Sequence, residues 1–174
     1  MMRYLFLILY YGFATYLPDS YSPFIGKISN SIRIFLCRRI FKKCGKEKII
    51  INRKAYFGNG KDIEIGDFSS IGAETILPNN IIIGKYVMMA PYVHILANNH
   101  CFDRTDIPIC FQGYSPHQAI EIEDDCWIGQ RVIIIPNRKV KKGTIIATGA
   151  VVTKDYEEYS IIGGNPAKLI RKRI

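Results

Sequence analysis

One histidine lies where an otherwise regular part of the sequence is interrupted, and its chemistry is that of a general base. His100 belongs to the stretch ANNHCFDRTDIPICFQGYSPHQ. An alcohol is a poor nucleophile near neutral pH, and imidazole, with an ordinary pKa of about 6.5, is well matched to removing its proton. From residue type alone, a polar loop residue is the simpler interpretation of His100. Its role therefore depends on the elements that position it.

Those elements follow from a repeat of six residues that begins at Ile65. Each frame starts with an aliphatic residue: Ile65, Ile71, Leu77, Ile83, Met89, and after an interruption Ile122, Ile128, Ile134, Val140, Ile146 and Val152. A small or β-branched residue comes four positions later: Ser69, Thr75, Ile81, Val87, Val93, Cys126, Val132, Thr144 and Ala150. Arg138 is the misfit in that column.

A period of six predicts three short strands per coil, so that 18 residues complete one turn of a triangular prism. We expect the aliphatic starter to fill the prism at each corner and the small residue to point inward. Glycine in the second place of a frame is expected to ease the corner. A weaker frame at Ile51, Phe57 and Ile63 indicates one irregular coil before the regular ones. A β-sandwich would show period-two alternation instead.

The sequence before the repeat predicts two helices. Residues 2–16 are apolar and aromatic, residues 17–26 form a turn, and residues 27–44 alternate apolar and basic side chains. The first stretch is shorter than the ~20 residues that span a bilayer, and no small-residue cleavage site follows it. Two interpretations are open: the helices pack on the main domain, or they lie on an anionic membrane.

The formal net charge of +9 suits an anionic partner, either a phosphorylated cofactor, an acidic glycan or a membrane surface. No nucleic acid is expected, because the basic stretches lack a recognised binding motif. The five cysteines include no CxxC pair, which favours a reduced, cytosolic protein, and Cys126 is read as a core residue.

The segments IEDDCWIGQRVIIIP, ATGAVVTKD and GGNPAKLI resemble the hexapeptide-repeat acyltransferases, and LYYGFATYLPDSYSPFIGK resembles those that acetylate polysaccharide sugars. The resemblance implies a mainly β chain folded as a left-handed parallel β-helix. We expect residues 1–48 to be helical, residues 49–165 to form the β-helix with an extruded loop at 97–119, and residues 166–174 to form a short C-terminal helix.

The implied activity is direct transfer of an acetyl group from acetyl-CoA to a sugar hydroxyl, with His100 as the base and no metal. The implied assembly is a homotrimer with active sites between subunits, in the cytoplasm or at the inner face of the membrane. The resemblance assigns acceptor contacts to Ser70, Asn98 and Asn99, although the asparagines could simply turn the loop. The implied cofactor contacts are Trp127, Gln130, Thr148, Thr153, Lys154, Lys168 and Arg171.

Two departures from the family pattern affect these expectations. Ser70 occupies a position where sugar acetyltransferases have an acceptor-contacting Asn. Pro136-Asn137-Arg138 replaces Pro-Gly-Val, and Arg138 cannot be buried there unpaired. We expect that coil to bulge, or Arg138 to turn outward or face a neighbouring subunit.

Other functions are considered against these residues. Zinc held by three histidines, as in the γ-class carbonic anhydrases of this fold, is disfavoured because His94 and His100 lack the His-Gly-Cys run. His94 is expected to point outward, and His117 lies late in the loop. The alternatives are an N-acetyltransferase of nucleotide-linked amino sugars, disfavoured by the missing Gly-rich loop, and a non-enzymatic β-helix scaffold. Serine acetyltransferase is disfavoured because its helical N-terminal domain is missing.

Overall fold

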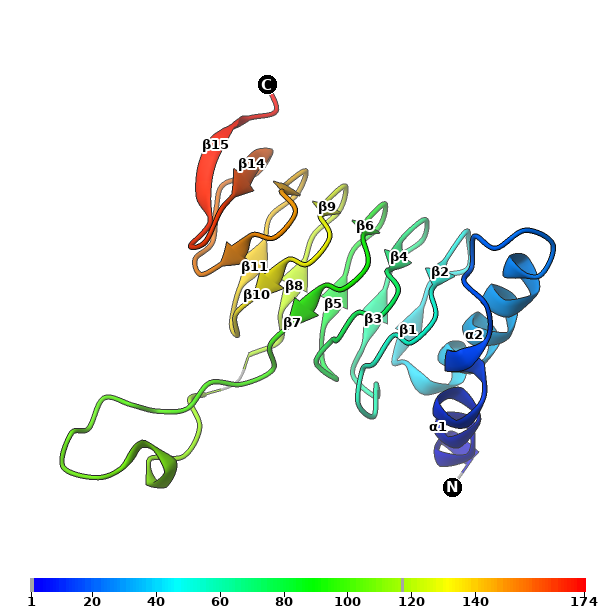
Figure 1. The fold of residues 1–174 in the computed structure, drawn as a ribbon, viewed down its shortest axis with the longest axis horizontal. Helices are drawn as coiled ribbons and strands as arrows, with labels where there is room; N and C mark the ends of the chain where they lie inside the picture. The colour runs from blue at the N-terminus through cyan, green and yellow to red at the C-terminus, as the bar shows by residue number, and fades with distance from the viewer. Residues whose placement is uncertain (1, 117) are drawn as a thin grey trace.

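A computed structural model describes residues 2–116 and 118–174, and it shows a parallel β-helix with a helical cap at its N-terminal end and an extended arm (Figure 1). Two helices, α1 (Met2–Gly12) and α2 (Gly26–Ile40), form the cap, with the short helix η1 (Ala14–Tyr16) between them. The arm carries η2 (Ile109–Phe111). Among the described residues, no helix has the length and apolar character needed to cross a membrane.

The strands are arranged as three faces. Face 1 is one parallel sheet of β1 (Lys43–Cys44), β3 (Glu64–Ile65), β5 (Ile82–Ile83), β8 (Glu121–Ile122) and β11 (Lys139–Val140). Face 2 contains β2 (Ile50–Ile51), β4 (Ser70–Ile71), β6 (Met88–Met89), β9 (Trp127–Ile128), β12 (Ile145–Ile146), β14 (Ser160–Gly163) and β15 (Lys168–Lys172). Face 3 contains β7 (His94–Ile95), β10 (Ile133–Ile134) and β13 (Val151–Val152), preceded by bridges at Tyr56 and Ile76.

The register between coils follows the six-residue frame. Glu64 is paired with Ile82, 18 positions later, and Ile82 is paired with Glu121, across the arm. The same 18-residue step recurs on face 2, from Trp127 to Ile145, and on face 3, from Ile133 to Val151. The arm is therefore an insertion that leaves the stacking of the coils on either side of it unchanged. This confirms the predicted β-helix.

The interior of the prism is filled by the two predicted columns. Every aliphatic starter from Ile65 to Val152 is buried, and so is every residue of the small or β-branched column except Arg138. The Ser69 hydroxyl donates to the carbonyl oxygen of Gly84 at 2.7 Å and accepts from the Val87 amide at 3.0 Å. The inward polar side chain thus bonds to the backbone of the next coil. Ile51, Phe57 and Ile63 are also buried, in the irregular first coil.

The corners differ from the prediction in one respect. The residue that takes the left-handed backbone conformation is the fourth of most frames, as at Phe68, Glu74, Tyr86 and Tyr92, with φ between +55° and +61°. The second-place glycines have no positive φ, and they are needed for a different reason. A Cβ on Gly72 would lie 2.1 Å from the Ala90 carbonyl oxygen of the next coil. These glycines therefore permit close stacking of coils, and the backbone strain lies two residues further on.

The strained corners are supported by contacts with the equivalent corner of the next coil. The rings of Phe68 and Tyr86 stack with centroids 5.1 Å apart and planes inclined by 13°. Arg131 lies over the ring of Tyr92, with its guanidinium carbon 5.8 Å from the centroid. Such stacking of exposed side chains along an edge compensates part of the cost of a bulky residue at positive φ.

The two helices cover the open N-terminal end of the prism. Leu36, Cys37 and Ile40 of α2 and Tyr10 of α1 belong to the same core cluster as the first coils. Arg33 is fully buried, and its guanidinium donates to the carbonyl oxygens of Ile51, Ala14, Leu17 and Pro18 and to the Ser20 hydroxyl, at 2.7–3.3 Å. This one side chain joins α2, the turn after α1 and the first coil. The helices thus pack on the main domain.

The predicted C-terminal helix is wrong. Residues 168–172 form β15, which pairs antiparallel with β14 and closes the other end of the β-helix. The antiparallel hairpin satisfies the backbone groups of β14, the last parallel strand of face 2, which would otherwise form an open edge. The N-terminal boundary also differs, since β1 pairs with β3 and so belongs to the first coil.

Arg138 turns outward, which is one of the expected alternatives. Its side chain is 27% exposed and its Nη1 lies 3.5 Å from the Asp155 carboxylate, while Nε donates to the Pro136 carbonyl at 3.2 Å. Asn137 takes the left-handed conformation at φ +60°, and its side chain bonds Gln118 and Pro116 at the base of the arm. The replacement of Gly by Asn thus preserves the corner and anchors the arm.

The close stacking of coils predicts the effect of adding one methyl group. Gly72→Ala should lower the free energy of unfolding by about 3 kcal/mol, because the Ala90 backbone has to move. Gly12→Ala is the matched control, since nothing lies within 4 Å of its Cβ position, and it should change stability by less than about 1 kcal/mol. Denaturant unfolding followed by circular dichroism measures both. Equal stability of the two variants would contradict the stacking argument.

Candidate active site

The arm leaves the prism after β7 on face 3 and returns at β8 on face 1 (Figure 1). It is held together by its own contacts: the amide of Cys101 donates to the Gly113 carbonyl at 3.1 Å, and the amide of Ser115 donates to the Asn99 carbonyl at 2.9 Å. Gln112 bonds the backbone of Arg104 and Ile107 further out. The arm is therefore a structured two-stranded extension.

His100 lies in the first half of this extension, opposite the returning segment. Its Nδ1 is 3.3 Å from the Gly113 carbonyl oxygen, and its ring stacks on Tyr114 with centroids 4.4 Å apart. A carbonyl oxygen can only accept, so a neutral imidazole here carries its proton on Nδ1. The lone pair is then on Nε2, which is the form that a general base requires. The imidazole is exposed to solvent.

Tyr114 and Gly113 are the residues of this site that the sequence does not reveal. They hold the histidine ring from the opposite side of the arm, 13 and 14 positions along the chain. Their pairing depends on where the arm turns back. No regular spacing predicts that turn, because the hexapeptide frame is absent from the arm.

The predicted acceptor contacts are divided between the arm and the prism. Asn98 and Asn99 are exposed next to His100, and the Asn99 side chain accepts from the His100 amide at 3.1 Å. Ser70 lies outward on face 2, where its hydroxyl accepts from the Met89 amide at 3.1 Å. It also lies 3.4 Å from the Val87 carbonyl oxygen. Ser70 thus has a role in joining adjacent coils.

The predicted cofactor contacts lie mainly on face 2 and at its edge. Trp127 projects from β9 and is 49% exposed. Gln130 and Thr148 are exposed at the corner beyond face 2, in adjacent coils that are joined by the Gly149 amide and the Gln130 carbonyl at 2.8 Å. Thr153 and Lys154 are exposed beyond β13, and the Lys154 ammonium lies over the Tyr156 ring.

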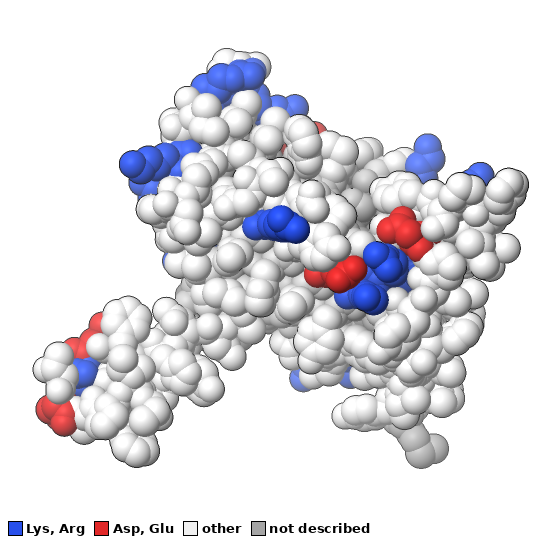
Figure 2. All heavy atoms as spheres, in the orientation of Figure 1, with Lys and Arg blue, Asp and Glu red and all other residues white. Residues whose placement is uncertain are grey.

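Lys168 and Arg171 lie on β15, at the edge of face 2, rather than on a helix. The sheet order β15-β14-β12-β9 places them three strands from Trp127, a separation of about 14 Å at the usual strand spacing. Both side chains are exposed, and Arg171 donates only to the backbone of Lys172 among the described residues. Figure 2 shows Lys and Arg side chains gathered at this end of the molecule.

His100 and the face 2 residues do not meet within one chain. Among residues 2–116 and 118–174, the contacts of His100 are with Asn99, Gly113 and Tyr114, and none is with a predicted cofactor residue. The arm points away from the prism (Figure 1). One copy of the chain therefore presents the His100 imidazole and the face 2 surface separately.

The comparisons with known proteins agree with this fold. No family model matches the chain. A Saccharomyces cerevisiae protein named as an acetyltransferase is 33% identical over 137 residues, which cover 78% of this chain and 68% of that protein. The crystal structure of a maltose O-acetyltransferase from Clostridium difficile 630 has a TM-score of 0.77 at 28% identity, covering 98% of this chain and 85% of that one. The chain belongs to the hexapeptide-repeat acetyltransferases.

Two further acetyltransferases resemble this chain. A hexapeptide-repeat acetyltransferase of Vibrio cholerae has a TM-score of 0.73 at 27% identity, covering 82% of this chain and 80% of that one. A chloramphenicol acetyltransferase of Agrobacterium fabrum is 54% identical over 61 residues. That match spans 35% of this chain and only 29% of the Agrobacterium protein.

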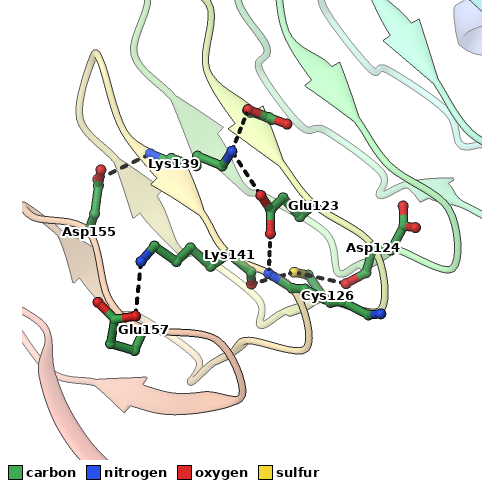
Figure 3. Close-up of polar contacts among 9 residues, drawn as sticks. Glu123, Asp124, Cys126, Lys139, Lys141, Asp155 and Glu157 are labelled. Atoms are coloured by element: carbon green, nitrogen blue, oxygen red, sulfur yellow. Dashed lines mark hydrogen bonds and ion pairs between the residues drawn. The ribbon is translucent and has the colours of Figure 1, made fainter.

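Face 1 of this acetyltransferase carries a charged ladder that is neutralised within the chain (Figure 3). The Lys139 ammonium lies 2.8 Å from the Glu123 carboxylate and 3.0 Å from that of Glu121. The hydrogen bonds to Glu123 and Glu121 hold the pKa of Lys139 well above its usual range. Lys141 pairs with Glu157 in the next coil at 3.0 Å. These residues join successive coils, so the candidate site lies on the other faces and the arm.

A metal site is not formed by the described part of the chain, where no three histidine, cysteine or acidic side chains cluster. His94 points outward from β7 on face 3. His117 lies outside the described residues.

The cysteines of this acetyltransferase differ in reactivity. Cys126 is 1% exposed, and burial raises the pKa of its thiol to about 11. Cys37 is fully buried, whereas Cys110 is exposed on the arm. Cys126 is thus a core residue, as its place in the repeat predicts, and its thiol is little ionised at neutral pH, where the thiolate is the reactive form.

Alkylation measures this difference. At pH 7.5, iodoacetamide should modify Cys110 in the native protein while Cys126 and Cys37 react only after unfolding, with sites mapped by mass spectrometry. Raising the pH should not expose Cys126 until the fold is lost, because access as well as thiolate formation limits its reaction. Rapid labelling of Cys126 in the folded protein would contradict its assignment to the core.

Proposed function

We propose that this chain is an acetyl-CoA-dependent O-acetyltransferase that acts on a sugar hydroxyl, with His100 as the general base. The observation that carries the proposal is the geometry of the arm, where the Gly113 carbonyl fixes the proton on Nδ1 and leaves Nε2 free at an exposed position. The maltose O-acetyltransferase that resembles nearly the whole chain supports a sugar acceptor. The polysaccharide-type N-terminal segment favours an acceptor in surface polysaccharide synthesis.

In the proposed reaction, His100 Nε2 removes the proton from the acceptor hydroxyl as its oxygen bonds to the acetyl carbonyl carbon. Coenzyme A leaves as its thiolate and takes the proton back from the imidazolium, so the base is regenerated. The Gly113 carbonyl keeps the ring oriented and stabilises the imidazolium through the Nδ1 hydrogen bond. Asn98 and Asn99 lie next to the histidine, where they can contact the acceptor.

Face 2 fits a molecule with an apolar arm and a phosphorylated end. The exposed side chains of Trp127 and Met88 offer an apolar surface, and Lys168 and Arg171 offer cations at the sheet edge. We assign acetyl-CoA to this face, with Gln130 and Thr148 beside its central part and Thr153 and Lys154 at the neighbouring corner. The thioester then supplies the activated acetyl group near Trp127.

We further propose a homotrimer in which the arm of one copy reaches face 2 of the next. Two faces of the prism present apolar stripes outward. Their apolar members are Met88, Trp127, Ile145 and Ile161 on face 2, and Tyr56, Ile76, Ile133 and Val151 on face 3. Phe102, Phe111 and Tyr114 of the arm are also exposed. Different apolar surfaces that fit each other produce a closed ring rather than a two-fold dimer.

Replacement of the base tests the chemistry. His100→Ala should lower kcat by about 10²–10⁴-fold, because proton removal then depends on water, while the dissociation constant of coenzyme A stays within about twofold. Thiol release from acetyl-CoA is followed with a panel of sugars, nucleotide sugars and chloramphenicol, and products are identified by mass spectrometry. Lys61→Ala, an exposed change on the prism, is the control. Full activity of His100→Ala would contradict the mechanism. An N-acetylated amino sugar as the product would show that the enzyme is an N-acetyltransferase instead.

Mixed trimers test the shared site. Thr148→Trp should block the cofactor surface, since Thr148 is exposed and the change does not enter the core. Each of Thr148→Trp and His100→Ala alone should be inactive. Copies of the two co-expressed in equal amounts should recover about a quarter of the wild-type activity, because one site in four then combines an intact arm with an intact face 2. Light scattering verifies three copies. If verified mixed trimers recovered no activity, Thr148 and His100 would belong to a site within one chain.

A further inference from the structure

The outer surface of the helical cap is unlike that of an ordinary helix pair. Inward residues of α2 are buried against the first coils, but its outward stripe contains Ile28 and Phe35, which are 61% and 52% exposed. The exposed side of α1 contains Leu5, Ile8 and Leu9. In all, twelve large apolar or aromatic residues are exposed between Met2 and Phe35: Met2, Tyr4, Leu5, Ile8, Leu9, Phe13, Tyr16, Tyr21, Phe24, Ile25, Ile28 and Phe35.

Charged side chains do not interrupt the exposed apolar side of α1. The sequence of α1, MRYLFLILYYG, contains one charged residue, Arg3, whose guanidinium reaches back to the Ile40 and Asn59 carbonyls. The visible part of α1 in Figure 2, at the lower right, carries no charged side chain. A surface of this size and composition marks a contact with an apolar medium.

Between the two helices the apolar surface is hollowed into a groove of about 650 Å³. It is lined by Leu9, Phe13, Lys27, Ile28, Ser31, Ile32, Phe35 and Leu36. Lys27 is the one charged residue of this lining. The groove is therefore shaped to take up hydrocarbon.

A second hollow of about 620 Å³ adjoins the groove and has the opposite character. It shares Ser31 and Phe35 with the groove, and its lining includes the four cations Arg38, Arg39, Lys46 and Lys48 and no acidic residue. None of the four forms an ion pair with the described residues. Arg38 is held by the Gly45 and Lys46 carbonyls at 3.1 and 3.0 Å, which fixes its position at the rim.

Phe35 is the residue that joins the two hollows. Its ring lies under the Arg39 guanidinium, whose carbon is 3.6 Å from the ring centroid, and its carbonyl accepts from Arg39 Nη1 at 2.8 Å. A cation is thus held directly above an apolar surface. Molecules with this pairing of a negative group and an adjacent hydrocarbon are anionic lipids.

We propose that the outer face of the α1–α2 cap binds an anionic lipid bilayer, with α1 and the groove in the acyl boundary and the basic hollow at the phosphate headgroups. The helix α1 has 11 residues, about 16 Å of length, so it lies along the interface. A second copy of the chain is a poorer occupant, because two apposed caps would bring two sets of four cations together.

Vesicle sedimentation tests the proposal without any measurement of turnover. The full chain should sediment with vesicles of phosphatidylcholine containing 30% phosphatidylglycerol, and it should remain in the supernatant with pure phosphatidylcholine. Binding should weaken as salt rises, because the headgroup contacts are screened. Equal sedimentation with both vesicles, or with neither, would overturn the proposal.

Two kinds of variant separate the two halves of the site. Arg39→Glu with Lys46→Glu should weaken vesicle binding by about tenfold or more, at roughly 1 kcal/mol for each cation lost. Ile28→Asp with Phe13→Asp should abolish it by removing insertion. Lys85→Glu with Lys142→Glu makes the same charge change away from the cap and should bind as the wild type does.

Circular dichroism and light scattering of each variant distinguish loss of binding from loss of fold. All the substituted side chains are exposed, so the thermal midpoints should agree within a few degrees. If Ile28→Asp with Phe13→Asp instead changed the number of copies in the particle, the groove would be a contact between chains and the lipid proposal would fail. A basic-hollow variant that bound vesicles as tightly as its control would also refute it.

Discussion

The close approach of each coil's backbone to the next is the constraint on which the rest of this structure depends. A Cβ on Gly66, Gly72 or Gly129 would lie within 2.1–2.7 Å of backbone atoms in the adjacent coil. Successive coils therefore cannot shift relative to one another without a clash or the loss of a parallel hydrogen bond. This fixes the 18-residue register and makes the aliphatic starters stack on each other inside. It also forces the strain of each turn onto the fourth residue of the frame, where large side chains project outward and can stack along the edge.

Buried aliphatic and small side chains fill the described part of the prism from coil to coil, and this limits where a site can be. The inward positions are aliphatic or small, and the arm returns to the same register from which it departed. Reactive groups can only be carried on the arm and on the outward positions of the strands. His100 lies on the arm and Trp127 on face 2, and the proposed trimer would bring these two surfaces together from different copies.

Much of this fold could be predicted from the sequence, because the repeat encodes burial directly. Ile65, Ile71 and Cys126 are buried where the frame requires it. The position of the backbone strain could not be predicted, since the fourth place accepts Phe, Glu, Tyr or Asn and so leaves no pattern. The strand β15 could not be predicted either, because apolar and polar residues do not alternate regularly over residues 168–172. These residues form a strand because they pair with the open edge of β14.

The candidate site was less predictable than the fold, for a similar reason. His100 could be selected from the place where it interrupts the frame, but the ring contacts with Gly113 and Tyr114 depend on the turn of the arm. The role of Ser70 as a bond between coils follows from Met89 lying beside it in space, 19 positions away. Arg138 shows the same dependence, since its partner Asp155 is in the next coil. The repeat predicts the burial that all coils share. It does not predict the contacts that are particular to one coil, such as those of His100, Ser70 and Arg138.

The two ends of the β-helix show this difference most clearly. Every interior coil is covered above and below by its neighbours, so the two ends need other elements to cover them. The C-terminal end is closed by a hairpin whose exposed strand carries cations beside face 2. At the N-terminal end, the cap is held by the buried Arg33, which donates only to carbonyl and hydroxyl oxygens. α1 is joined to the first coil by the Tyr10 and Tyr11 hydroxyls, which donate to the Ala55 and Gly58 carbonyls, so the polar contacts of the cap lie on its inner side.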